Sequence, residues 1–306
     1  MDKSETPSDE TKCGYVTLLG APNAGKSTLL NQLVGAKIAI VSPKVQTTRA
    51  RVTAIAIEDN CQMIFVDTPG IFAPSRRLEK AMVNAAWDGA QDADQVALLV
   101  DAIKGITKDV ERIIEGLQQS GQKAHLILNK IDAIKRDKLL GLAQELTERG
   151  VFEKVYMVSA LTGDGVADLR ADLAKELPDG PWLFPEDQLA LAPMRSLAAE
   201  ITREKLFLRM NQELPYSLTV ETENWEERKD GSVKINQVIY VSRANHKPII
   251  LGKGGKTIKT IGAMAREELE ESLGQRVHLF LFVKVREKWT DDPERYQEMG
   301  LDFPKD

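Results

Sequence analysis

Gly20-Ala-Pro-Asn-Ala-Gly-Lys-Ser27 decides the fold of this chain, because it fills every position of the phosphate-loop pattern Gly-x-x-x-x-Gly-Lys-Ser. An apolar run over residues 15–19 precedes it and a helical pattern over 27–34 follows it. This is the order of strand, loop and helix that the motif requires. Such a loop turns backbone N–H groups toward phosphate oxygens, beside a helix N-terminus. A lone Gly-rich turn is often only a helix cap, but the complete pattern in this context argues against that reading.

A second motif, Asp67-Thr-Pro-Gly70, ends the apolar run 63–66 and completes a phosphate and metal site. Lys26 is expected to reach the β- and γ-phosphate oxygens, the Ser27 hydroxyl to coordinate Mg²⁺, and Asp67 to hold that ion through water. The Gly70 N–H can approach the γ-phosphate closely. The expected phosphate site comprises Gly20, Ala21, Pro22, Asn23, Ala24, Gly25, Lys26, Ser27, Thr28, Asp67, Thr68, Pro69, Gly70 and Ile71.

Two further motifs, Asn129-Lys-Ile-Asp132 and Ser159-Ala160, end the apolar runs 125–128 and 155–158. Ligands of open parallel sheets bind at the carboxyl ends of the strands, so these motifs are expected to meet. Guanine presents N1–H and a 2-amino group side by side, and the Asp132 carboxylate can accept from both. A surface bend is the alternative for the first motif alone. The expected base site comprises Asn129, Lys130, Asp132, Ser159, Ala160 and Leu161, in which the Asn129 side chain also braces the phosphate loop.

Gln46-Thr-Thr-Arg-Ala50 lies in a polar stretch before the strand-like residues 51–57. In a GTP site, a mobile threonine hydroxyl is expected to close on Mg²⁺ when the γ-phosphate is bound. Thr48 is the first choice and Thr47 the second, and a plain Thr-rich loop is the alternative. The predicted metal ligands are Ser27, Thr48 and Asp67, and the predicted catalytic groups are Lys26, Thr48, Gly70 and Asn23.

Ile71 occupies the position at which many GTPases carry a glutamine that orients the attacking water. An isoleucine cannot do this, so slow hydrolysis aided by a partner, or help from another group, is expected. Asn23 is the candidate group, as a ligand of a monovalent cation such as K⁺ beside the phosphates. The equally weighted alternative is a loop asparagine that tolerates an unusual backbone angle.

Length and composition describe a protein of about two domains. The chain has 306 residues, a net charge of −5, two cysteines and three histidines, so neither a disulfide nor a zinc site is expected. Residues 1–12 are polar, without the apolar segment of a secretion signal, and are expected to form a flexible tail. No apolar run approaches the roughly 20 residues of a membrane span. Attachment to a membrane surface stays open.

Residues 13–177 alternate short apolar strands with amphipathic helices, which predicts an α/β fold with a mostly parallel sheet. A proline-rich linker follows over 178–193. The predicted strands are 15–19, 51–57, 63–66, 96–100, 125–128 and 155–158, and the predicted helices are 27–34, 78–90, 108–119, 139–149 and 166–177.

Residues 194–306 predict a smaller α+β domain with the order helix, strand, strand, helix, strand, over 195–210, 217–222, 234–242, 256–273 and 277–285. Gly252-Lys-Gly-Gly255 precedes the long helix and fits the Gly-x-x-Gly loop of a type II KH module, which clamps single-stranded RNA. No acidic residue occurs between 243 and 259, which suits phosphate contacts, whereas a solvated lysine-rich helix start is the alternative. The predicted RNA contacts are Arg243, Lys247, Gly252, Lys253, Gly254, Gly255, Lys256 and Lys259.

Together these motifs resemble the Era family of bacterial GTPases, over nearly the whole chain. The resemblance implies a P-loop GTPase domain followed by a type II KH domain. It also implies an assembly factor that hydrolyses GTP to GDP and binds the small (30S) ribosomal subunit, with its KH module on the 3′ end of the small-subunit ribosomal RNA. Such proteins are cytoplasmic, with a fraction at the cytoplasmic face of the inner membrane, and a monomer is the default expectation. The acidic segment 290–306 follows the pattern least closely.

Three other readings stay open at this point. A ribosome factor with two GTPase domains needs a second phosphate loop, and the sequence contains none. A tRNA-modifying relative is expected to end in a cysteine-containing motif, whereas this chain ends in Phe303-Pro-Lys-Asp306. A passive RNA-binding protein would bind GTP without releasing phosphate, which the intact Lys26, Ser27 and Asp67 argue against.

Overall fold

The computed structural model describes residues 11–304 except 192, 212, 213 and 288. Most of the predicted tail, residues 1–10, and the last two residues, 305–306, therefore lie outside the described residues. The chain divides into two compact units. The first comprises residues 1–36, 51–73 and 83–191, and the second comprises 37–50, 74–82 and 192–306.

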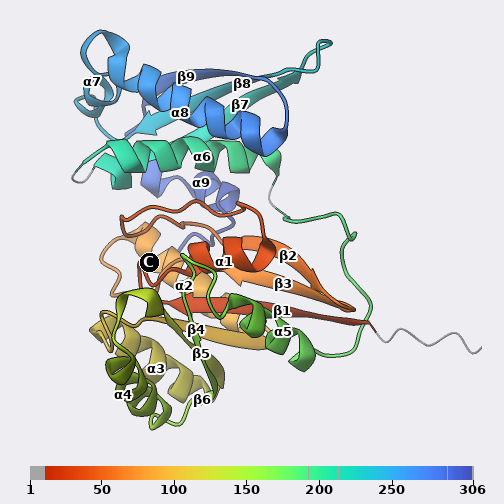
Figure 1. Ribbon diagram of the computed structural model, residues 1–306. Coiled ribbons are helices and arrows are strands. Elements are labelled where there is room, and N and C mark those ends of the chain that lie inside the picture. Colours follow the sequence, from red (N-terminus) through yellow and green to blue (C-terminus); the bar gives the residue numbers. More distant parts are fainter. Residues whose placement is uncertain (1–10, 192, 212–213, 288, 305–306) are drawn as a thin grey trace, which may run out of the picture. The chain divides into compact units, whose positions relative to one another are not determined.

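The first unit contains a six-stranded sheet with the order β2-β3-β1-β4-β5-β6 (Figure 1). All neighbours are parallel except β2 and β3, which are antiparallel. This confirms the predicted α/β class with a mostly parallel sheet. The strands are β1 Lys12–Gly20, β2 Val52–Glu58, β3 Cys61–Asp67, β4 Gln95–Asp101, β5 Ala124–Asn129 and β6 Phe152–Val158.

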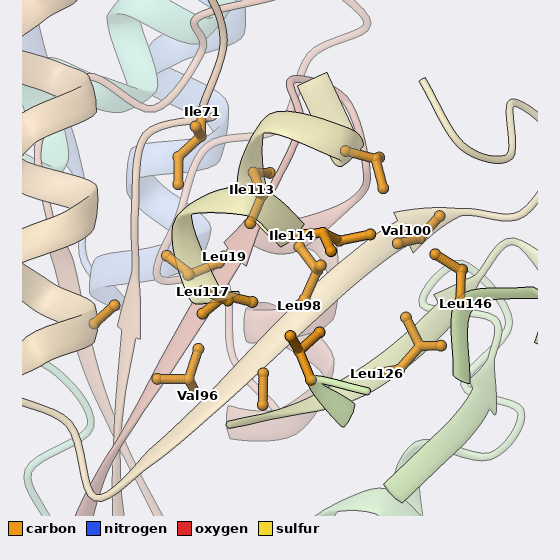
Figure 2. Packing of buried hydrophobic residues seen from close by; sticks show 14 of the residues in the cluster. Leu19, Ile71, Val96, Leu98, Val100, Ile113, Ile114, Leu117, Leu126 and Leu146 are labelled. Carbon is orange, nitrogen blue, oxygen red and sulfur yellow. The ribbon is translucent and has the colours of Figure 1, made fainter. Parts of the chain in front are cut away.

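Helices flank this sheet, and one side of it holds a large apolar core built from β1, β4, β5 and the helices α2, α3 and α4. Figure 2 shows Leu98 of β4 with Ile114 and Leu117 of α3 among the side chains of this core. The Thr107 side chain caps α3 by accepting from the Val110 N–H, which fixes where that helix begins. The helices are α1 Lys26–Val34, α2 Arg77–Gln91, α3 Lys108–Ser120, α4 Arg136–Thr147, α5 Val166–Glu176 and the short 3₁₀ turn η1 Ile131–Ala133. The part of α2 before residue 83 belongs to the second unit.

Parallel pairing brings the sequence motifs to one edge of the sheet. The phosphate loop begins at Gly20, where β1 ends, and Asp67 and Asn129 are the last residues of β3 and β5. Ser159 follows directly after β6. Because parallel strands share one direction, their carboxyl ends lie together, and this is the usual place for a ligand in such a sheet.

The second unit contains a three-stranded sheet with the order β7-β8-β9, in which β7 is antiparallel and β9 parallel to β8. Apolar residues of α6 and α8 pack on the strands to form its core (Figure 1). Its larger elements are α6 Met194–Arg209, β7 Leu218–Glu227, β8 Val233–Val241, α7 His246–Leu251, α8 Lys256–Leu273, β9 Val277–Val285 and α9 Pro293–Glu298. The short turns are η2 Leu214–Ser217, η3 Lys253–Gly255 and η4 Trp289–Asp291.

The order of elements in this unit agrees with the predicted one, with two additions. The six-residue α7 was not predicted, and neither was α9 in the acidic segment 290–306. That segment is partly buried, because the Tyr296 and Leu301 side chains are 1% and 3% exposed. Among the described residues, none of the helices combines the length and apolarity needed to cross a bilayer.

Candidate functional site

The phosphate loop adopts a backbone that its residue types permit. Gly25 has φ 100°, and a Cβ atom there would lie 2.2 Å from Asn129 Nδ2, so this position excludes any side chain. Asn23 has φ 63°, in the left-handed region that asparagine tolerates better than most residues. This angle is the one that the loop-asparagine reading of Asn23 requires, and it leaves the cation-ligand reading open.

The Lys26 side chain is held inside the loop. It is 6% exposed, and its ammonium group donates to the Gly20 carbonyl at 3.1 Å and to the Ala21 carbonyl at 3.4 Å. Burial lowers the pKa of Lys26, and the negative charge of Asp67 partly offsets that effect. A desolvated cation surrounded by carbonyl oxygens suits an anionic ligand, because phosphate oxygens can replace the carbonyl acceptors and neutralise the charge.

Ser27 and Asp67 form the part of the predicted metal site that the first unit contains. The Ser27 hydroxyl donates to Asp67 Oδ2 at 2.6 Å, and the Asp67 side chain is fully buried. A hydroxyl and a carboxylate are hard oxygen donors of the kind that Mg²⁺ binds, usually together with substrate phosphates and water. The donor set therefore fits this ion. No cluster of three or more His, Cys, Asp or Glu able to hold a metal occurs in the part of the chain that the structure describes.

The Asp67-Thr-Pro-Gly70 segment closes against the phosphate loop. Thr68 donates its hydroxyl to the Leu18 carbonyl at 2.8 Å, and the Ile71 N–H donates to the Gly20 carbonyl at 3.1 Å. A Cβ atom on Gly70 would lie 2.9 Å from Pro22 N, so only glycine allows this approach. The Ile71 side chain is fully buried in the core cluster, where Figure 2 shows it, and a side chain placed this way cannot orient a water molecule.

Asn129 is the brace between the base motifs and the phosphate loop. Its Nδ2 donates to the Ala24 carbonyl at 2.8 Å, and its Oδ1 accepts from the N–H groups of Lys130 at 2.8 Å and Ala160 at 2.9 Å. The side chain is 1% exposed. The structure thus joins three of the four sequence motifs through one amide.

Lys130 and Asp132 are oriented by neighbours of their own. The Lys130 ammonium donates to the Asn23 carbonyl at 2.9 Å and lies 2.7 Å from Asp101 Oδ2, while Ser159 donates its hydroxyl to Asp132 Oδ1 at 2.6 Å. The sequence prediction did not include Asp101. The sequence signal that could have indicated Asp101 is its position at the end of β4, which lies between β1, the strand before the phosphate loop, and β5, the strand that ends in Asn129.

The remaining base-site residues differ in their exposure. Ser159 is fully buried and Ala160 is 2% exposed, whereas Leu161 is 76% exposed. The backbone N–H of Ser159 donates to the Asp164 carbonyl at 2.9 Å, which closes the loop that presents the Ala160 N–H.

The predicted switch threonines belong to the second unit. The Thr47 hydroxyl is engaged within its own loop, donating to the Lys44 carbonyl at 2.8 Å and lying 2.6 Å from Ser42 Oγ. Thr48 is half-buried. The Thr47 hydroxyl would have to leave these partners to bind a metal ion, and the choice between Thr48 and Thr47 as the metal ligand stays a prediction.

The Gly-rich loop of the second unit joins α7 to α8. Gly252 has φ 70°, and a Cβ atom there would lie 2.1 Å from Thr257 Oγ1; Gly254 and Gly255 also have positive φ. The basic side chains predicted to contact RNA are all exposed, and they lie in the loop and in the segments before and after it, namely Arg243, Lys247, Lys253, Lys256 and Lys259. Exposed ammonium and guanidinium groups beside a narrow glycine turn form a surface suited to a phosphate backbone.

Comparisons with known proteins agree with both units. Residues 15–130 match the family model "50S ribosome-binding GTPase", and residues 213–290 match the family model "KH domain". The chain is 62% identical to the GTPase Era of Sinorhizobium medicae, over 96% of this chain and 95% of the relative. It is 59% identical to the GTPase Era of Bradyrhizobium diazoefficiens, over 97% and 96%.

Two solved structures are similar over the same extent. One is a variant of Aquifex aeolicus Era bound to GDP and tetrafluoroaluminate, with a TM-score of 0.90 and 39% identity, covering 95% of this chain and 99% of that chain. The other is Era in complex with MgGDPNP and nucleotides 1506–1542 of 16S ribosomal RNA, with the same TM-score, identity and coverage.

The fold and the comparisons define a P-loop GTPase with a C-terminal KH domain, which confirms the predicted fold class. The identity with known relatives, over nearly the full length of each, places it more narrowly. The chain belongs to the GTPase Era family, and the predicted family resemblance is confirmed.

Proposed function

We propose that this protein is a GTP-hydrolysing switch that binds the 3′ end of the small-subunit ribosomal RNA through its KH domain and acts in assembly of the small subunit. The observation that supports this most strongly is the match, with a TM-score of 0.90, to the Era structure that holds MgGDPNP together with 16S ribosomal RNA nucleotides 1506–1542. Crosslinking of RNA to the protein in cells, followed by sequencing, tests it. A peak at the 3′ end of the small-subunit RNA supports the proposal, and its absence contradicts it.

The nucleotide is held from both ends in this proposal. Lys26 and the loop N–H groups bind the phosphates, and the Asp132 carboxylate accepts from the paired donors of guanine. The Ala160 N–H, which donates to Asn129 Oδ1 in this structure, is proposed to be shared with the guanine O6 when the nucleotide is bound. Water attacks the γ-phosphorus in line with the bond to the bridging oxygen, which leaves with GDP. Lys26 stabilises the negative charge that moves to this oxygen, and its buried position strengthens that interaction.

Mg²⁺ is the metal proposed for the site, held by Ser27 and Thr48 directly and by Asp67 through water, where it neutralises phosphate charge when bound. The short Ser27–Asp67 bond supports the placement of two of these residues. Ser27→Ala is expected to weaken GTP binding in Mg²⁺ more than in EDTA. An equal loss in both conditions argues that the hydroxyl has no part in metal binding.

K⁺ is proposed as the additional cation, with Asn23 as its ligand, because the buried Ile71 offers no polar group for catalysis. Turnover of GTP is then faster in KCl than in NaCl at equal ionic strength. Asn23→Gly preserves the left-handed backbone angle of this position and removes the amide, so it should abolish the difference between the salts. Equal wild-type rates in both salts contradict the cation proposal.

The RNA site is proposed to comprise the glycines of the 252–255 loop and the exposed basic residues around it. Lysine contacts to phosphate release counterions, so removal of one such contact reduces the salt dependence of binding by about one unit of slope. Lys256→Gln should show this reduction. Lys229→Gln is the matched control, since Lys229 is exposed in the same unit but lies in the β7–β8 turn.

Nucleotide state is proposed to change the affinity for RNA. In that case an RNA of the 1506–1542 type binds with different affinity in the presence of GDP and of a non-hydrolysable GTP analogue. Equal affinities with both nucleotides argue against the coupling, while leaving hydrolysis and RNA binding intact as separate activities.

The remaining assignments concern organisation in the chain and in the cell. We propose a GTPase domain at 13–177, a linker at 178–193 and a KH domain at 194–306. We also propose a monomer in the cytoplasm, with a fraction at the cytoplasmic face of the inner membrane and with the 30S subunit as partner. Sedimentation of cell extracts separates the soluble, membrane and ribosomal fractions and tests these assignments together.

A further inference from the structure

Arg49 directly follows the switch residue Thr48 and is buried in the second unit. Its side chain is 5% exposed. Nη1 donates to the Leu218 carbonyl at 2.7 Å and Nη2 donates to the Pro215 carbonyl at 3.0 Å. The acceptors are the backbone carbonyls of the first residue of β7 and of a residue in η2, which precedes β7, and both lie more than 160 residues away in sequence.

Two aromatic rings complete the surroundings of this guanidinium. The Arg49 Cζ atom lies 5.7 Å from the ring centroids of both Phe207 and Trp289. Burial lowers the pKa of Arg49 to about 9, and the nearby Arg203 adds to that effect, so the group is still charged at neutral pH. A buried charge is costly unless it is bonded, and here two carbonyls and two ring faces fix its position.

Other residues of the 37–49 segment are also attached to α6. Arg203 donates to the Thr47 carbonyl, the Lys44 ammonium donates to the Met210 carbonyl at 2.6 Å, and the Val41 N–H donates to Glu204 Oε1 at 2.8 Å. The switch segment of this unit is therefore fixed at several points on both sides of Thr48.

A chain of contacts also leads from Arg49 toward the proposed RNA surface. The Trp289 Nε1 group donates to Ser242 Oγ at 2.9 Å, and Ser242 immediately precedes Arg243, the first basic residue of that surface. Trp289 is 1% exposed, so its ring cannot move without disturbing either Arg49 or Ser242. Contiguous buried contacts of this kind can carry coupling between two sites.

We propose that Arg49 is a positioning residue for GTP hydrolysis, through which the KH domain and the RNA bound to it fix the backbone of Thr48. This rests on the proposed function. Consecutive Cα atoms are about 3.8 Å apart, so an anchored Arg49 leaves Thr48 little freedom. A threonine held in this way closes on its ligand without first losing backbone entropy, which raises the rate of the chemical step more than it raises affinity for the nucleotide.

The test is steady-state GTP turnover by the full-length protein, with and without an RNA of the 16S 3′-end sequence. Arg49→Ala is expected to lower kcat about tenfold, to change KM and the Kd for GDP less than twofold, and to abolish the effect of RNA on turnover. Arg49→Lys keeps the charge but cannot donate to two carbonyls in the same geometry, so an intermediate kcat is expected.

Phe207→Leu removes one of the two rings that contact the Arg49 guanidinium and leaves the sequence of the switch segment unchanged. It is expected to lower kcat in the same direction, without a change in KM, and it serves as the second variant if Arg49→Ala does not fold. Arg209→Ala is the matched control, because Arg209 is exposed on the same helix as Phe207. Urea unfolding of each variant provides the folded fraction by which its rate is normalised.

The outcomes separate this proposal from the proposed function. Wild-type protein that releases no phosphate, with or without RNA, overturns both. Wild-type protein that hydrolyses GTP while the Arg49 and Phe207 variants keep its kcat, its KM and its response to RNA overturns the positioning role alone. Variants that lose stability but keep the normalised kcat assign Arg49 a purely structural role, which also overturns it.

Discussion

Replacement of Asn129 by alanine tests the brace that holds the nucleotide site together. The side chain makes three hydrogen bonds at 2.8–2.9 Å and is 1% exposed. Without it, the Ala24 carbonyl and the Ala160 N–H lose their partners in buried surroundings. The third partner, the Lys130 N–H, is only partly buried, so water can replace that bond.

The magnitude follows from these two buried groups. A buried polar group left unsatisfied costs about 1–3 kcal/mol, so Asn129→Ala should lose about 2–6 kcal/mol in total. This loss is divided between the free energy of unfolding without nucleotide and the free energy of GDP binding, according to how far the empty loop relaxes. If all of it falls on binding, affinity drops about 30- to 20,000-fold.

Two measurements on the same preparation check the sum. Titration calorimetry with GDP gives the loss in binding, and urea unfolding without nucleotide gives the loss in stability. Asn84→Ala is the matched control, because Asn84 is an exposed asparagine on α2 of the same unit. If Asn129→Ala binds GDP within threefold of wild type and unfolds at the same urea concentration, the brace contributes no energy and the reasoning fails.

Three further predictions concern other parts of the chain. Asp132→Asn removes the acceptor of both guanine donors and should weaken GDP about 100-fold while improving binding of xanthosine diphosphate, as competition binding measures; unchanged selectivity would contradict the base assignment. Gly252→Ala places a Cβ atom 2.1 Å from Thr257 Oγ1, whereas a Cβ atom at Gly254 meets nothing within 4 Å. The affinity for RNA and the stability of the second unit should therefore fall more for Gly252→Ala than for Gly254→Ala. Equal losses would assign the whole effect to the positive φ that both glycines share. Burial lowers the pKa of His125, so the imidazole becomes protonated at a lower pH in the folded state than in the unfolded state. The free energy of unfolding should therefore fall as the pH drops below about 6.5, the pKa in the unfolded state, and should level off below the folded-state pKa. Urea unfolding at several pH values should show a flatter slope for His125→Gln, and a slope equal to that of wild type would exclude His125 as the source.

The placement of the four motifs at one edge of the sheet could be predicted from the sequence, because each motif stands at the end of an apolar run. Parallel strands of a sheet bring their carboxyl ends to one edge, so motifs as far apart as Gly20 and Ser159 could be placed together from the sequence alone. Local apolar periodicity also predicted the longer helices, and the predicted ends of these helices lie within about three residues of the observed ends. The helices followed from local sequence, and the meeting of the motifs followed from the rule that parallel strands end at the same edge of a sheet.

The features that the sequence did not reveal depend on partners without a sequence signature. Arg49 donates to two backbone carbonyls, and any residue type at those positions would supply them. The sequence predicted a role for its neighbour Thr48, because a threonine hydroxyl is a known type of Mg²⁺ ligand. It predicted no role for Arg49, because an arginine in a polar loop is usually exposed to solvent. Helix α7 was missed because six residues containing Pro248 are too few for a helical period to stand out.

The burial of Ile71 bears on where catalytic help for GTP hydrolysis can come from. Its N–H closes the phosphate loop on Gly20 and its side chain is fully buried in the core, so a polar group at this position would be desolvated rather than presented to water. We therefore expect catalytic help to come from groups placed by other segments. The structure offers Asn23 in the phosphate loop and a switch segment anchored by Arg49 to the RNA-binding unit. Under the positioning role proposed for Arg49, the rate of hydrolysis depends on the RNA that the second unit holds, because positioning of Thr48 takes the place of the missing glutamine.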